Sequence, residues 1–150
     1  MCKYDYYADV KYYQHMPENI QDSCPFCAAS ENPDQHIIYE NSCCFYLRKP
    51  QAKLTGAGLI VPRSHKQTVF DLSTEEWADT LDLLHRAKSY LDDQFNPDGY
   101  TVGWNSGEAA GQDIPHAHLH VIPRFNASPS SGISIRDGLL RRLDVTDGLI

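Results

Sequence analysis

The chain of 150 residues has the length of one domain that can bury a hydrophobic core. Hydrophobic residues make up 41% of it and charged residues 22%, which excludes a disordered or collagen-like chain. Thirteen basic against twenty acidic residues leave a net charge of −7, which disfavours duplex nucleic acid as a partner. The apolar run around Leu59–Val61 is too short to cross a membrane.

Two further features bear on the cellular compartment. The first six residues contain no apolar signal region, so secretion is not expected. The five cysteines are an odd number, and they favour a reducing compartment over a disulfide framework. We therefore expect a cytoplasmic protein with no membrane partner.

Residues 24–125 are expected to form one domain between two less regular segments. Residues 1–23 are rich in tyrosine and polar groups without a clear period, and we interpret them as an N-terminal arm. Residues 126–150 begin with a flexible turn rich in serine and are interpreted as a C-terminal tail.

Short strands rich in β-branched and aromatic residues are predicted on both sides of one helix. Three strands precede the helix and two follow it: 37–40, 43–48, 56–62, 100–104 and about 116–122. A Gly-rich polar loop separates the last two strands. Because short connections join strands around one main helix, the pattern predicts an α+β fold with an antiparallel sheet.

The helix has the clearest signals in the chain. Ser73 and Glu76 form a capping-box pattern at its start, and the Asn-Pro-Asp-Gly sequence at residues 96–99 ends it. One helical stripe is apolar apart from a lysine and is predicted to face a core: Trp77, Leu81, Leu84, Lys88, Leu91 and Phe95.

The two cysteines of Cys24-Pro25-Phe26-Cys27 form a C-x-x-C pair. The pair resembles the redox site of glutaredoxins, but the strand and the helix that should flank such a site are missing. Alternatively, the two thiolates are half of a zinc site, which needs two more ligands. Two buried free cysteines are the remaining interpretation.

Three histidines alternate along the last predicted strand, at His116, His118 and His120. Alternate residues of a strand share a face, so the histidines face one side while Ala117 and Leu119 pack on the other. A solvent-facing row and a shared metal ion are two interpretations. However, the outer two histidines would lie roughly 13 Å apart, and zinc–nitrogen bonds are only about 2 Å long. A third interpretation is phosphoryl chemistry, in which a neutral imidazole attacks phosphorus and its neighbours bind the phosphoryl oxygens.

The segment His116–Ile122 resembles the histidine-triad motif of the HIT superfamily of nucleotide hydrolases and transferases. Further segments match in order: Leu59–His65 resembles the family's strand and trailing histidine, and Gly103–Gly107 with Ala110–Gln112 resembles its phosphate loop. The similarity covers roughly residues 24–125. It implies a HIT-like fold, an antiparallel sheet of about five strands with one main helix packed on it. Many relatives dimerise through the helix and an edge strand, so a homodimer is expected.

The resemblance also implies a role for each matching residue of the site. His118 would be the nucleophile that takes up the nucleotidyl group, and His120 would contact the phosphate and assist the leaving group or the water. Asn105 and Gln112 would donate hydrogen bonds to phosphate oxygens, and the backbone at Gly111 would let the phosphate approach closely.

A structural zinc site is implied as well. In zinc-bearing branches of the family, the C-x-x-C pair is joined by the histidine after the third strand and by the first triad histidine. The matching residues are Cys24, Cys27, His65 and His116. Such a site is closed and holds the N-terminal segment against the histidine row.

Two positions depart from the family pattern. Leu47 stands where relatives place an Asp or Asn that bonds the ribose hydroxyls, and a leucine cannot accept such bonds. Asp113 follows Gln112 where Ser or Thr is usual. Its carboxylate would repel a phosphate unless it is turned away or paired.

Three functions remain in competition. The favoured one is hydrolysis at the α-phosphate of a nucleoside phosphoramidate or dinucleoside polyphosphate, through a nucleotidyl–His118 intermediate. The second is a non-catalytic nucleotide-binding or scaffold module, which the leucine at position 47 favours. The third is a zinc-dependent hydrolase that uses the histidines as an open metal site.

Overall fold

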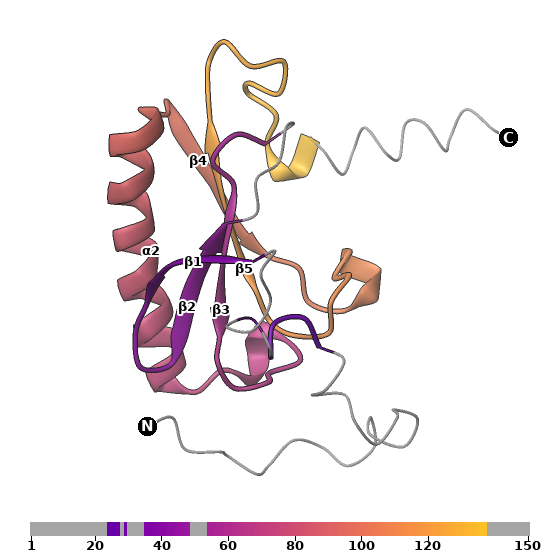
Figure 1. Cartoon of the computed structure of the whole chain (residues 1–150). Coiled ribbons are helices and arrows are strands. Elements are labelled where there is room, and N and C mark those ends of the chain that lie inside the picture. Colours follow the sequence, from indigo (N-terminus) through magenta and orange to yellow (C-terminus); the bar gives the residue numbers. More distant parts are fainter. Residues whose placement is uncertain (1–23, 28, 30–34, 49–53, 138–150) are drawn as a thin grey trace, which may run out of the picture.

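A computed structural model describes residues 24–27, 29, 35–48 and 54–137 (Figure 1). The predicted arm and the end of the predicted tail lie outside these residues. The described strands are β1 (His36–Glu40), β2 (Cys44–Arg48), β3 (Gly58–Pro62), β4 (Gly99–Trp104) and β5 (Leu119–Arg124). The main helix is α2 (Thr74–Phe95), and two short 3₁₀ turns are η2 (Val69–Asp71) and η3 (Glu108–Ala110). Residues 135–137 are also helical.

The five strands form one sheet in the order β1-β2-β3-β5-β4. Every neighbouring pair is antiparallel, and α2 packs along one face of the sheet (Figure 1). The predicted α+β fold, with an antiparallel sheet and one main helix, is therefore confirmed. Because β5 lies between β3 and β4, the strand that contains the last of the three histidines is interior to the sheet. No helix in the described ranges is long and apolar enough to span a bilayer.

Helix α2 begins and ends where the sequence predicts. Ser73 Oγ accepts a hydrogen bond from the Glu76 N–H at 3.2 Å, and Glu76 Oε2 accepts one from the Ser73 N–H at 2.8 Å. This reciprocal pair is the predicted capping box. At the other end, Asn96 adopts a left-handed conformation with φ 47°, a typical C-terminal cap just before a proline.

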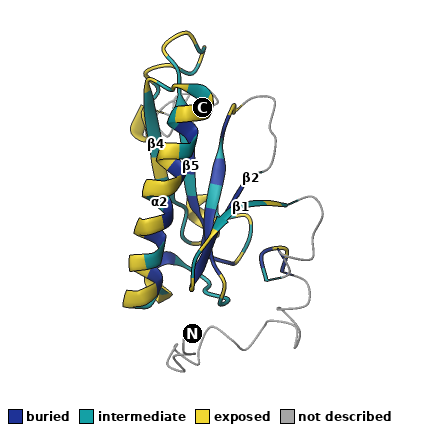
Figure 2. Ribbon diagram, turned by 60° about the vertical axis from the view of Figure 1, so that its left-hand side comes forward, coloured by how far each residue is buried: buried dark blue, intermediate teal, exposed yellow. Residues whose placement is uncertain are grey.

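The buried face of α2 differs from the predicted stripe. The fully buried residues are Glu76, Thr80, Leu83, Ala87 and Leu91, whereas Trp77 is 46% and Leu81 55% exposed. Figure 2 shows the exposed side of the helix turned away from the sheet. Leu91 belongs to both sets, and Leu84 and Phe95 of the predicted stripe are partly buried against the same cluster. The buried face is therefore shifted by less than one residue step, because the polar residues Glu76 and Thr80 are buried with their hydrogen bonds satisfied. A search for apolar residues at helical spacing cannot identify a buried face that begins with two polar residues.

Two apolar clusters cover opposite faces of the sheet. The cluster under α2 contains Cys43, Cys44, Tyr46, Ile60, Leu83, Ala87, Leu91, Leu119 and Val121. The cluster on the other face contains Cys24, Phe26, Ala29, Phe45, Leu47 and Val61. Neighbouring residues of β2 and β3 fall into different clusters because successive side chains of a strand alternate between its faces. The second cluster fixes the C-x-x-C segment on the face opposite α2.

Candidate active site and metal cluster

The histidine row lies at the start of β5 and only partly within it. The prediction of a strand over 116–122 is wrong at both ends, since β5 runs from Leu119 to Arg124. The β3 ladder ends at the pair Ile60–Leu119 and the β4 ladder at Trp104–Leu119. Before this point, the Ala117 N–H donates to the Lys66 carbonyl at 2.6 Å instead. His116 and His118 therefore lie in the segment that leads into the strand.

Within β5 the predicted alternation holds. Leu119 and Val121 are buried in the cluster under α2. His120, which alternates with them, faces the other side. The rings of His118 and His120 lie side by side, with centroids 4.9 Å apart. The two imidazoles thus form a pair on the face opposite α2.

The backbone sets the tautomer of His118. Its Nδ1 lies 2.8 Å from the His116 carbonyl oxygen, and since a carbonyl can only accept, Nδ1 carries the proton. In the neutral ring Nε2 then has a free lone pair, the atom a nucleophilic imidazole needs. Asp113 Oδ1 is 3.9 Å from this nitrogen, and the Asp113 side chain is 82% exposed. The carboxylate is therefore on the solvent side of the imidazole.

His120 offers a polar atom without a partner. Its Nε2 is buried and has no hydrogen-bond partner among the described residues. Burial lowers the pKa of His120, and the neighbouring His118 lowers it further, while Asp113 acts in the opposite direction. A buried nitrogen without a partner is energetically unfavourable, so a ligand next to His118 would satisfy it.

The Gly-rich loop before the histidines is closed by the side chain of Gln112. Gln112 Oε1 accepts from the Gly107 N–H at 2.7 Å, and Nε2 donates to the carbonyls of Gln67 at 2.7 Å and Ile114 at 3.0 Å. The carbonyl and the NH₂ of the Gln112 amide are thus both bonded to backbone groups, of the loop and of the segment after β3. Its expected bond to phosphate stays a prediction, and what the structure adds is a role in shaping the loop.

Two neighbouring groups complete this loop. Gly107 and Gly111 have φ of +87° and +83°, a conformation that favours glycine. Asn105 Nδ2 donates only a long bond of 3.4 Å, to the Gly111 carbonyl. The predicted phosphate-binding residues therefore share one loop, and the Asn105 amide is only weakly engaged in it.

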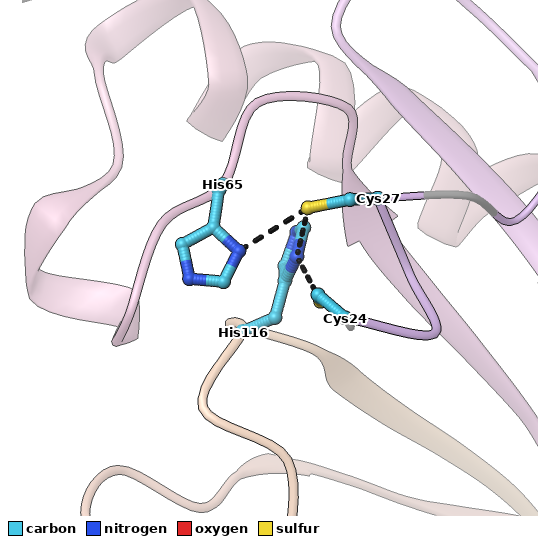
Figure 3. Close-up of side chains that lie close together, drawn as sticks. All are labelled: Cys24, Cys27, His65 and His116. Atoms are coloured by element: carbon cyan, nitrogen blue, oxygen red, sulfur yellow. Dashed lines mark hydrogen bonds between the residues drawn. The ribbon is translucent and has the colours of Figure 1, made fainter. Parts of the chain in front are cut away.

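The four predicted metal ligands come together in a compact cluster (Figure 3). The ligand atoms of Cys24, Cys27, His65 and His116 all lie within 4.8 Å of one another. His65 Nδ1 is 3.2 Å from Cys27 Sγ, and His116 Nδ1 is 3.4 Å from Cys24 Sγ and 3.6 Å from Cys27 Sγ. Tetrahedral zinc with bonds of about 2.0 Å to nitrogen and 2.3 Å to sulfur places N and S roughly 3.5 Å apart. The observed spacing fits such an ion.

The protonation states of the two histidines also suit a metal. His116 Nε2 lies 2.9 Å from the Pro62 carbonyl oxygen, so this nitrogen donates and Nδ1 presents its lone pair to the thiols. His65 bonds the carbonyl of Pro115. Burial lowers the pKa of His116 to about 4 and also lowers that of His65, which keeps both rings neutral. Backbone carbonyls that fix ligand tautomers in this way are typical of metal sites.

Phe26, one of the two residues between the cysteines, contacts both the cluster and the histidine pair. The Phe26 ring is 4% exposed, meets His116 edge-on at 5.7 Å and lies 5.3 Å from the His118 ring. Sequence reasoning missed this contact, although the position inside the C-x-x-C pair placed Phe26 close to the cluster. Leu47, at the position where relatives contact the ribose, is 2% exposed in the same apolar cluster as Phe26, and its side chain offers no hydrogen bond.

Comparison with known proteins agrees with this architecture. A family model of the HIT domain matches residues 30–127, well over half of the chain. The chain therefore belongs to the HIT domain family. A zinc-bound histidine triad family protein from Mycobacterium smegmatis superposes with a TM-score of 0.65 at 27% identity, over 84% of this chain and 99% of that one. A HIT family protein from Bacillus anthracis, at 24% identity and TM-score 0.65 over 86% of this chain and 99% of that one, has the same fold.

Among curated relatives, a bis(5'-adenosyl)-triphosphatase from Dictyostelium discoideum is 34% identical over 88 residues, 59% of each chain. The protein hit of Bacillus subtilis is 28% identical over 120 residues, 79% of each chain. A bis(5'-adenosyl)-triphosphatase from Saccharomyces cerevisiae is 29% identical over 76% of this chain and 53% of its own length. The chain thus spans only half to three fifths of the triphosphatases that it matches.

Proposed function

We propose that this protein is a nucleotide hydrolase or transferase that cleaves at the α-phosphate of its substrate through a nucleotidyl–His118 intermediate. The observation that carries the proposal is the pair of imidazoles on the face opposite α2. In this pair, the bond to the His116 carbonyl leaves His118 Nε2 with a free lone pair, and the neighbouring His120 Nε2 has no partner in the described part of the chain.

The reaction follows from these two atoms. The lone pair of His118 Nε2 attacks the α-phosphorus, a nitrogen–phosphorus bond forms, and the bond to the leaving group breaks. The His116 carbonyl stabilises the positive charge that develops on the His118 ring through Nδ1–H. Water then attacks phosphorus and gives up a proton to His120, the nitrogen–phosphorus bond breaks, and the free imidazole of His118 is restored. His120 contacts the phosphoryl oxygens, as do Asn105 and the loop backbone at Gly111.

Two substrate classes are considered: dinucleoside polyphosphates and nucleoside phosphoramidates. The names of two curated relatives, both bis(5'-adenosyl)-triphosphatases, support the first class. The apolar environment of Leu47 instead indicates that the ribose hydroxyls are bound more weakly than in relatives with an Asp or Asn at this position. A nucleotide-binding module without turnover is therefore the second candidate function.

The metal cluster is proposed to hold a structural zinc ion. Two cysteines and two histidines fill all four positions of a tetrahedral ion, which leaves no open position for water or substrate. Bound there, zinc supplies a cross-link between the C-x-x-C segment, the loop after β3 and the histidine row. This closed donor set argues against the zinc-dependent hydrolase. The thiols of Cys24 and Cys27 are free and must stay reduced to bind zinc, which supports the expected cytoplasmic location. Cys43, by contrast, is disulfide-bonded, so the expectation of a chain without disulfides is wrong at this residue.

A homodimer is proposed through the exposed side of α2. Phe70 is 87%, Trp77 46% and Leu81 55% exposed, and the Trp77 ring meets that of Trp104 at 5.9 Å. Trp104 lies on β4, an edge strand of the sheet. This apolar surface (Phe70, Trp77, Leu81 and Trp104) adjoins the outer edge of β4, which no described strand pairs, so a second copy would bury the side chains and pair the strands.

The covalent intermediate can be tested by intact mass spectrometry of protein denatured seconds after mixing with an adenosine phosphoramidate or a diadenosine triphosphate. Wild type is expected to carry a nucleotidyl adduct, and His118→Ala to lose both the adduct and more than about 99% of turnover, as removal of a nucleophile requires. His85→Ala is the control, because His85 is exposed on α2. An adduct or full turnover in His118→Ala would refute the nucleophile. Nucleotide binding without any consumption would favour the binding module.

A further inference from the structure

The segment from Ser64 to Gln67, which follows β3, contacts every part of the proposed site. His65 lies in the metal cluster. The Lys66 carbonyl accepts the Ala117 N–H at 2.6 Å, between the first two histidines of the row. The Gln67 carbonyl accepts from Gln112 Nε2 at 2.7 Å, which ties the segment to the Gly-rich loop. The relative placement of all three parts therefore depends on where residues 64–67 lie.

This segment is held by one carboxylate on α2, that of Glu76. The hydroxyl of Ser64 donates to Glu76 Oε1, and Lys66 Nζ lies 3.8 Å from Glu76 Oε2, with the two side chains 13% and 2% exposed. The same Oε2 accepts the Ser73 N–H at 2.8 Å. Glu76 thus binds the segment and caps the helix at the same time.

The burial of Glu76 exceeds what a helix cap requires. The residue is only 1% exposed, and an ionised carboxylate is removed from water at a large free-energy penalty unless charged and polar groups surround it. A capping glutamate can perform its task at the surface. The additional partners that offset the penalty here are both on residues 64–67.

We propose that Glu76 is a positioning residue, which clamps residues 64–67 to α2 and thereby places the histidine row and the Gly-rich loop relative to each other. The inference rests on the proposed function for its effect on turnover, but the clamp itself is a structural property. Glu76 touches no reacting atom and acts through the Lys66 and Gln67 carbonyls. A small displacement of these carbonyls would move His118 away from the phosphate held by the loop, and rates respond steeply to such shifts.

The chain offers a matched pair of variants. Ser64→Ala removes the hydroxyl that Glu76 binds on the segment and leaves both capping-box bonds in place. Ser73→Ala removes the other half of the cap, the bond from the Glu76 N–H, and leaves the clamp in place. Both variants lose one hydrogen bond at Glu76, so a general loss of helix stability affects them alike. Lys66→Met is a second clamp variant that keeps the Lys66 carbonyl.

Two measurements test the positioning role of Glu76 separately from the proposed reaction: amide hydrogen exchange and steady-state kinetics. Amide hydrogen exchange at Ala117 reports the bond to Lys66, and the Asp98 amide, bonded to the Arg124 carbonyl at the far end of β5, serves as the internal control. In Ser64→Ala and Lys66→Met, exchange at Ala117 is expected to accelerate about tenfold while Asp98 is unchanged. With a substrate that wild type consumes, kcat/KM should fall about tenfold in both variants.

Ser73→Ala should change both readouts less than about twofold, although its unfolding temperature falls. Ser64→Ala and Lys66→Met with Ala117 exchange like that of wild type would overturn the proposal. The proposal would also be overturned if Ser73→Ala accelerated exchange at Ala117 and lowered kcat/KM as much as the two clamp variants do. If wild type consumes no substrate, the exchange measurement still decides the clamp, and the proposed function fails on its own.

Discussion

Gln112 shapes the Gly-rich loop through its side-chain amide. The amide accepts one loop N–H and donates to two carbonyls, so the loop depends on it whether or not it also bonds phosphate. Gln112→Glu keeps the size and the acceptor but turns a carboxylate oxygen toward two carbonyl oxygens. We expect the loop to open and KM for the nucleotide to rise about tenfold, the loss of one to two hydrogen bonds.

The measurement is steady-state kinetics of Gln112→Glu beside Gln94→Glu, a control on the exposed side of α2. An unchanged KM in Gln112→Glu would show that these three bonds do not set the loop's affinity for phosphate.

Cys44 gives a residue-scale prediction about pH. Its thiol is fully buried between β2 and α2, and burial raises its pKa from 9.0 to about 11. A raised pKa means that the neutral thiol contributes stability fully below about pH 9 and loses it as the pH rises toward 11. The unfolding free energy of wild type relative to Cys44→Ala should therefore shrink by about 2 kcal/mol between pH 8 and pH 10.5. The same difference at both pH values, measured by urea unfolding, would contradict this.

At the residue scale, the sequence identified the residues of the site but not the hydrogen bonds and ring contacts that they make. All four cluster ligands were predicted through the family resemblance, and the structure brings them together. The tautomer of His118 and the contact of Phe26 with its ring could not be predicted. Both depend on groups that approach only in the folded chain, the first on the local path of the backbone before β5 and the second on a segment about 90 residues away.

Among the elements, α2 carries leucines on two of its faces, and only one of these faces packs against the sheet. Leu83 is 0% and Leu81 55% exposed, although they are only two residues apart. Leu83→Ala is expected to destabilise the folded protein by about 2–5 kcal/mol, because it leaves a cavity in the cluster under the helix. Leu81→Ala should change the monomer's stability by less than about 0.5 kcal/mol.

Leu81→Ala should instead weaken self-association, because Leu81 belongs to the surface proposed for the dimer. Chemical denaturation gives the first comparison, and sedimentation across a range of concentrations gives the second. A large stability loss in Leu81→Ala with no change in self-association would place this residue in the core instead.

The elements themselves were largely predictable. The bounds of α2 follow from a capping box and a proline stop, and the strands from their residue content. The rest depended on partners distant in sequence. The start of β5 at Leu119 is set by where β3 and β4 cease to pair with it, and the buried face of α2 depends on hydrogen bonds that polar residues find only after packing.

On the scale of the whole molecule, the metal cluster joins the C-x-x-C segment to the neighbouring ends of β3 and β5. Cys24 and Cys27 lie before β1, His65 follows β3 and His116 precedes β5. An ion bound to all four resembles a cross-link between distant parts of the chain, and it stabilises the folded state by mass action because the unfolded chain holds no preformed site. At a free zinc concentration a thousandfold above Kd, this amounts to about 4 kcal/mol.

Removal of the metal should therefore lower the unfolding temperature by about 10 °C, and Cys27→Ser should behave like the chelated wild type. Cys44→Ser is the matched control, because Cys44 lies in the cluster under α2 on the opposite face of the sheet and should keep one zinc ion per chain. The order of events on chelation separates the two roles of a metal. With a structural ion, turnover persists below the lowered unfolding temperature. If turnover instead disappears while the unfolding temperature stays constant, the ion takes part in the chemistry, and the histidine pair is not the nucleophilic centre.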